Sequence, residues 1–130
     1  MYEALLDTSV LIDRETLDLG DYSEAVAAVS AVTVAELAYG LDVPDPIERL
    51  TRTERLEKVL RDFDVLPFTL EAAKLYGTLA SLVRLSGRNP RPRRLDLHIA
   101  ATAVAHRIPL LTRNPDDFTS LKRLLKVVPI

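Results

Sequence analysis

Short apolar segments alternate with amphipathic helical segments along nearly the whole chain. Buried, β-branched composition predicts strands at 4–6, 26–32, 64–67, 108–112 and 124–130. Between them apolar residues recur at helical spacing, most clearly from Ala72 to Val83. This alternation favours an α/β fold with a mainly parallel sheet covered by helices on both faces. Because the chain has 130 residues and no linker or repeat, we expect a single domain, residues 1–130.

Composition removes several classes of function. The chain has no cysteine and two histidines, which excludes disulfide scaffolds, thiolate zinc sites, iron–sulfur clusters and histidine-rich metal sites. No apolar run reaches the roughly 18–20 residues of a membrane helix, and the N-terminus lacks the basic start of a secretory signal. We therefore expect a soluble, cytoplasmic protein without membrane contact. The net charge of −2 gives no general positive field, so any nucleic-acid site must be local.

Acidic residues stand at the predicted strand-to-helix junctions. Asp7, Glu36 and the pair Asp116 and Asp117 each follow a predicted strand, and Asp96 opens the helix predicted at 95–107. Parallel strands bring such junctions to one edge of the sheet, where ligands of α/β folds bind. Carboxylates that converge there repel one another unless a cation neutralises them. With no cysteine or histidine ligand available, a hard ion such as Mg²⁺ fits, which indicates phosphodiester chemistry.

Helix capping is the alternative explanation for the same acids, because acidic side chains are favoured at helix N-termini. The clearest case is Glu36, since the segment from Thr33 to Glu36 has the form of a capping box and predicts a helix that starts there. Asp7, Asp96 and Asp116 would equally suit helix N-termini. Capping and metal binding are compatible, and the pattern of the acids as a set favours the metal site.

Three segments of the sequence resemble the PIN-domain ribonucleases, and within them the VapC-like toxins of bacterial toxin–antitoxin pairs. They are LLDTSVLI with Asp7, TVAELAYG with Glu36, and LDLHIAATAVAHRIPLLTRNPDDF with Asp96 and Asp117. The resemblance implies a PIN-like three-layer fold in which these four acids bind the metal. It also implies that Thr112 and Asn114 support the fourth acid, and it leaves Asp116 at a variable position of the family pattern.

The activity implied by this resemblance is that of an endoribonuclease that depends on Mg²⁺, with Mn²⁺ as a possible substitute. The acids would hold one or two ions that activate water to cleave RNA. The resemblance further implies a cognate antitoxin that covers the site, and a homodimer.

An arginine-rich loop precedes Asp96. Arg88, Arg91, Arg93 and Arg94 fall within seven residues that also contain two prolines. Arginine pairs well with phosphate, so the loop is a candidate for RNA contact. The alternative is a loop that is only solvated, because charge clusters often serve solubility alone.

Two other functions remain as alternatives. A phospho-acceptor receiver domain has a similar length, alternating elements and an acidic magnesium pocket, but Asp7 has no acidic neighbour and Arg113, not lysine, follows Thr112. A PIN-like module that binds RNA or a partner without cleavage is the third possibility. Nothing in the sequence supports a serine hydrolase or a nucleotide-binding loop, because no Gly-x-Ser-x-Gly or glycine-rich phosphate motif is present.

Overall fold

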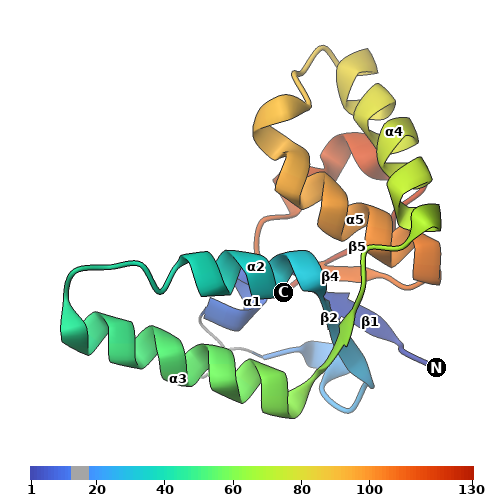
Figure 1. Ribbon diagram of the computed structural model, residues 1–130. Coiled ribbons are helices and arrows are strands. Elements are labelled where there is room, and N and C mark those ends of the chain that lie inside the picture. Colours follow the sequence, from blue (N-terminus) through green and yellow to red (C-terminus); the bar gives the residue numbers. More distant parts are fainter. Residues whose placement is uncertain (13–17) are drawn as a thin grey trace.

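The computed structural model describes residues 1–12 and 18–130, and shows strands and helices in alternation (Figure 1). The observed start of the second helix and the observed ends of several strands differ from the predicted ones. In chain order the elements are β1 (Ala4–Leu6), α1 (Thr8–Ile12), the 3₁₀ helix η2 (Gly20–Tyr22), β2 (Ala27–Ser30), α2 (Ala31–Tyr39), α3 (Pro46–Asp62), β3 (Asp64–Leu66), α4 (Leu70–Leu85), the 3₁₀ helix η3 (Arg91–Arg93), α5 (Arg94–His106), β4 (Leu110–Thr112), the 3₁₀ helix η4 (Pro115–Leu121) and β5 (Val127–Pro129).

The five strands form one sheet in the order β3-β2-β1-β4-β5, and every pairing is parallel. In the centre, Leu6 pairs with Val29 on one side and Leu111 on the other. From β1 the chain adds β2 and β3 on one side, and then β4 and β5 on the other side of β1. This topological switch point between β1 and β4 leaves a crevice beyond the carboxyl ends of the strands. Receiver domains have the order 2-1-3-4-5, so the observed order contradicts the receiver alternative.

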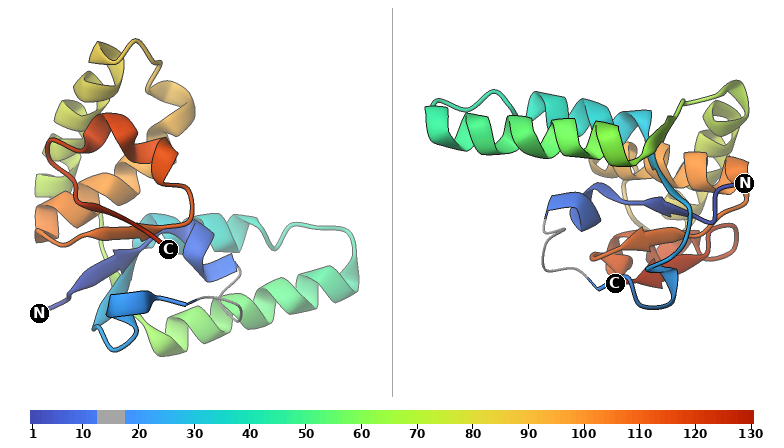
Figure 2. Two further views of the ribbon diagram at one scale, coloured as in Figure 1. Left: turned by 180° about the vertical axis from the view of Figure 1, so that it is seen from behind. Right: turned by 90° about the horizontal axis from the view of Figure 1, so that it is seen from below.

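Helices cover both faces of the sheet, because side chains of successive strand residues point to opposite sides. In β1, Leu5 packs with the cluster under α4, α5 and η4, whereas Ala4 and Leu6 pack with the cluster under α1, α2 and α3. In β4, Leu110 and Leu111 divide in the same way. Figure 2 shows the two groups of helices on either side of the strands. The predicted three-layer α/β fold is confirmed.

The start of α2 differs from the prediction. Ser30 is the N-cap, and its Oγ accepts hydrogen bonds from the backbone N–H groups of Val32 at 2.9 Å and Thr33 at 3.3 Å. Thr33 therefore lies inside the helix, and Glu36 is its sixth residue. The predicted capping box is wrong because a serine three residues earlier satisfies the free N–H groups of the first turn. Helix capping does not explain Glu36.

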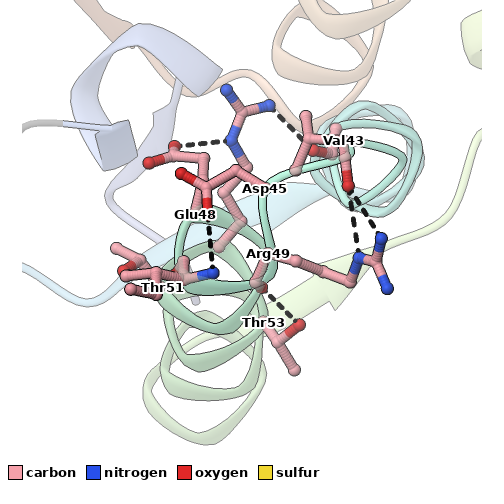
Figure 3. A network of polar contacts seen from close by, with 9 residues as sticks. Val43, Asp45, Glu48, Arg49, Thr51 and Thr53 are labelled. Atoms are coloured by element: carbon pink, nitrogen blue, oxygen red, sulfur yellow. Dashed lines mark hydrogen bonds and ion pairs between the residues drawn. The ribbon is translucent and has the colours of Figure 1, made fainter.

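Helices α2 and α3 form an arm that projects from the sheet (Figure 1), and polar contacts hold the connection between them (Figure 3). The Arg49 guanidinium donates to the Val43 carbonyl, with the shorter contact at 2.9 Å, and Asp45 caps α3 through the N–H of Ile47. The Arg52 guanidinium donates to the Gly40 carbonyl at 2.7 Å and to the Glu48 carboxylate at 2.8 Å. Asp45 and Pro46 thus begin α3. None of the described helices is long and apolar enough to cross a membrane.

Candidate active site at the carboxyl edge of the sheet

Asp7 lies directly after β1, and only 5% of its surface is exposed. Its Oδ2 atom accepts hydrogen bonds from the hydroxyls of Thr112 at 2.7 Å and Ser9 at 2.8 Å. Each hydroxyl has a single proton, so both protons are directed at one carboxylate oxygen. Thr112 comes from the end of β4, the neighbour of β1, so the sheet itself fixes this contact. No described residue hydrogen-bonds to Oδ1 of Asp7, which leaves that oxygen available to a ligand.

Glu36 reaches the same edge from the second turn of α2. Thr8 donates to its Oε1 at 2.9 Å, and the Thr8 and Thr33 hydroxyls lie 3.0 Å apart. Because Thr8 uses its proton on Glu36, Thr33 must donate to Thr8, which gives a chain of two hydroxyls ending on the carboxylate. Burial raises the pKa of Glu36, the Thr8 hydrogen bond partly offsets this, and the charge of Asp7 raises the pKa further.

Asp96 is the third residue of α5, and the charges of the other acids affect its pKa. Its pKa is raised to about 6: burial is the largest cause, the charges of Asp7, Asp117 and Glu36 also raise it, and Arg93 opposes the rise. Within the described residues, no group donates a hydrogen bond to the Asp96 carboxylate. The four acids predicted from the sequence are therefore close enough to act electrostatically on one centre.

Asp117 is the third residue of η4 and pairs with Arg93. Arg93 Nη1 lies 3.2 Å from Oδ1 and 3.4 Å from the backbone oxygen of Asp117, and both side chains are partly exposed. Asp116 is exposed, and its backbone carbonyl accepts from the Thr119 hydroxyl. Of these two neighbouring acids, Asp117 and not Asp116 raises the pKa of Asp96, which favours Asp117 as the candidate fourth acid.

One of the two supporting residues contacts a different acid from the one expected. Thr112 was expected beside the fourth acid, but its hydroxyl donates to Asp7, the first. Asn114 contributes through its backbone: its N–H donates to Thr112 Oγ1 and its carbonyl accepts from the N–H of Asp117. Parallel pairing of β1 with β4 decides this arrangement, because it aligns the two strand ends.

Three hydroxyl residues of the site were not identified from the sequence. Thr8 and Ser9 come immediately after Asp7 in the sequence, and Thr33 was assigned to a helix cap. Their hydrogen bonds instead orient Asp7 and Glu36. The available signal was the run of hydroxyl residues after the first acid, since such groups can donate to a neighbouring carboxylate.

The donor set suits a hard divalent cation. Each of the four acids keeps at least one carboxylate oxygen that receives no hydrogen bond from the described residues, and oxygen ligands are those that Mg²⁺ prefers. In residues 1–12 and 18–130, no three acidic or histidine side chains are already grouped as the ligands of one ion. The mutual electrostatic effects described above, rather than preset ligand geometry, support a cation at this edge.

An open groove runs beside two of the acids, at the N-terminal end of α5. Arg91 and Arg94 of the arginine-rich loop lie along it next to Glu36 and Asp96, and Pro92 and Leu95 complete the lining. Part of the predicted loop is the 3₁₀ helix η3, and Arg91 and Arg94 are exposed.

Residues 4–124 match the family model described as PIN domain. The chain belongs to the PIN-domain family. It is 37% identical over 121 residues to Ribonuclease VapC5 of Mycobacterium tuberculosis, covering 90% of this chain and 86% of that protein. It is 30% identical over 131 residues to Ribonuclease VapC of Rickettsia bellii, with 92% and 91% covered. The resemblance to VapC-type PIN proteins seen in the sequence is confirmed.

Solved structures agree with this assignment. The crystal structure of VapBC-5 from Mycobacterium tuberculosis, a member of the VapBC family of toxin–antitoxin systems, superposes with a TM-score of 0.77 at 31% identity, covering 100% of this chain and 98% of that chain. FitAcB from Neisseria gonorrhoeae gives a TM-score of 0.75 at 28% identity, with 95% of each chain covered.

Proposed function

We propose that this protein is the ribonuclease toxin of a toxin–antitoxin pair and that it hydrolyses RNA phosphodiester bonds with a divalent metal ion, Mg²⁺ or in its place Mn²⁺. The observation that carries the proposal is the set of four acids beyond β1 and β4, three of which raise the pKa of Asp96. The similarity to proteins named VapC ribonucleases supports RNA as the substrate.

Asp7, Glu36, Asp96 and Asp117 would hold the metal. When bound, a divalent ion supplies positive charge for the phosphate oxygens and lowers the pKa of water. Ser9 and Thr112 fix the Asp7 carboxylate by donating to Oδ2, and Thr8 fixes Glu36 by donating to Oε1. Asp96 must lose its proton to bind a cation, so cation binding should weaken as the pH falls below the pKa of Asp96, about 6 in the metal-free protein.

A cognate antitoxin is the partner we propose. The similar structure of VapBC-5 is that of a member of a toxin–antitoxin family, which supports such a partner here. The homodimer and the cytoplasmic location stay predictions from the sequence. Light scattering of the purified chain measures its oligomeric state, and a monomer at all concentrations would contradict the predicted homodimer.

The decisive experiment is cleavage of labelled RNA by the purified chain in excess EDTA, and then after Mg²⁺ or Mn²⁺ is restored. We expect no cleavage in EDTA and recovery with metal. Asp96→Asn, purified in parallel, exposes any contaminating nuclease because it should stay inactive. Cleavage that persists in EDTA would refute the metal mechanism. RNA binding without cleavage in either metal would instead favour the non-cleaving PIN-like module.

A further inference from the structure

The four arginines of the arginine-rich loop are not equivalent in the fold. Arg93 contacts Asp117, as described above. Arg91 and Arg94 line the groove next to Glu36 and Asp96. Arg88 follows α4 and is exposed outside that lining. A single loop therefore presents its guanidinium groups to three different surroundings.

Helical geometry explains this division. In a 3₁₀ helix, residues three apart lie one above the other. Arg91 begins η3 and Arg94 follows its last residue, so both face the groove, whereas Arg93 faces η4. Pro90 and Pro92 restrict the backbone, and Asn89 Oδ1 accepts the N–H of Arg91 at 3.1 Å. The placement is thus set by the backbone rather than by free side-chain motion.

The two arginines of the groove are positioned to contact an anionic ligand. Within the described residues, the side chains of Arg91 and Arg94 form no ion pair or hydrogen bond, and both residues are exposed. Guanidinium groups bind phosphate through two parallel hydrogen bonds. Arg93 is the cation that acts on Asp96, while Arg94 acts on His98, further along α5. The groove arginines thus lie beside two of the four acids, Glu36 and Asp96.

We propose that Arg91 and Arg94 bind the RNA backbone at a phosphate that flanks the cleaved bond, whereas Arg93 positions Asp117 and Arg88 makes no RNA contact. This inference rests on the proposed ribonuclease function and assigns the path of the substrate over the N-terminus of α5.

Four matched variants test the assignment: Arg88→Gln, Arg91→Gln, Arg93→Gln and Arg94→Gln each remove one positive charge from the same loop. Binding of a fluorescent single-stranded RNA is measured by anisotropy over a series of salt concentrations, in the Asp96→Asn background to prevent cleavage. We expect Arg91→Gln and Arg94→Gln each to weaken binding about tenfold. Their salt slope should fall by roughly 0.7 for each phosphate that the variant no longer neutralises. Arg88→Gln and Arg93→Gln should keep the parent slope.

A lysine variant separates charge from geometry. The double change Arg91→Lys with Arg94→Lys keeps both charges but loses the paired hydrogen bonds, so the salt slope should return while affinity recovers only in part. Thermal unfolding of every variant checks that the fold is intact. Slopes that fall equally for all four glutamine variants would overturn the assignment and indicate a diffuse charge effect.

An acidic segment of a partner protein is the competing occupant. The test is whether a polyglutamate peptide displaces the RNA from each variant. If the Arg91 and Arg94 variants bind RNA normally but the peptide no longer displaces that RNA, the groove binds acidic protein and the inference is wrong. Failure of this inference can be distinguished from failure of the proposed function, because cleavage of RNA by the unmodified chain in Mg²⁺ is measured separately.

Discussion

The two halves of the candidate active site are stabilised in different ways. Asp7 and Glu36, the hydroxyl-bonded pair, receive hydrogen bonds from Thr112, Ser9 and Thr8. Asp96 and Asp117, the charge-held pair, depend on electrostatics: Asp96 has no hydrogen-bond donor among the described residues, and Asp117 contacts Arg93. The first pair is preorganised by the strands and α2, whereas the second pair is stabilised only when positive charge is near.

The largest expected effect is the loss of RNA cleavage when any of the four acids becomes its amide. Asp7→Asn, Glu36→Gln, Asp96→Asn and Asp117→Asn each remove a negative ligand at nearly constant shape. We expect cleavage rates to fall on the order of 100-fold or more, as for removal of a group that stabilises transition-state charge. Single-turnover cleavage of labelled RNA measures this.

Asp116→Asn is the matched control for that series, because it removes one charge from the residue next to Asp117. Its rate should stay within a few-fold of the parent. If all five variants kept full activity and full stabilisation by Mg²⁺, the acids would not bind the metal and the ribonuclease proposal would fail.

Removal of a hydroxyl tests whether the first pair is preorganised. Thr112→Val keeps the shape of a buried residue but takes away the 2.7 Å hydrogen bond to Asp7. A hydrogen bond to a charged group contributes about 1.5–3 kcal/mol, so we expect at least a tenfold loss of cleavage. Thr33→Val is the control, since Thr33 reaches Glu36 only through Thr8. Equal effects of the two changes would argue against direct orientation of Asp7.

Asp96→Asn should stabilise the metal-free protein near neutral pH. The pKa of Asp96 rises from 3.8 to about 6 on folding, so the native state holds its proton more tightly than the unfolded chain. The resulting stability is present below the unfolded pKa and is lost as the pH rises through about 6. Allowing for solvent screening, we expect a gain of about 1 kcal/mol at pH 7.5, or a few degrees in Tm.

The pH dependence of the stability difference between the parent and Asp96→Asn tests the charge explanation. Thermal unfolding in EDTA is recorded for the parent and Asp96→Asn between pH 4 and pH 8. The difference in Tm should shrink as the pH falls below about 6, because the parent carboxyl then becomes neutral as well. A constant difference across the range would contradict the charge explanation.

The smallest expected effect concerns Arg93 and Asp117. Their ion pair is partly exposed, and such pairs contribute about 0–1 kcal/mol. A double-mutant cycle with Arg93→Gln and Asp117→Asn, measured by urea unfolding, should therefore give a coupling energy below about 1 kcal/mol. A much larger value would show that Asp117 is held as firmly as Asp7, and would remove the distinction between the two halves.

Sequence patterns predicted much of this molecule. The alternation of elements indicated the layered α/β class, and Asp96, placed at the start of the helix predicted at 95–107, lies in the first turn of α5. The prediction failed at Glu36, where two candidate caps, Ser30 and Thr33, stand three residues apart. Local sequence favours both, and packing of α2 on the sheet selects the earlier one, which buries Thr33.

By itself, the sequence determined the family and the sheet type and indicated the four candidate acids, because each depends on local residue types and their order along the chain. Tertiary structure alone decided which groups surround each acid. Thr112 donates to Asp7 across 105 positions, and Arg93 reaches Asp117 across 24. These contacts depend on the pairing of β1 with β4 and on where η3 meets η4, and no short-range pattern encodes distances between segments so far apart in sequence.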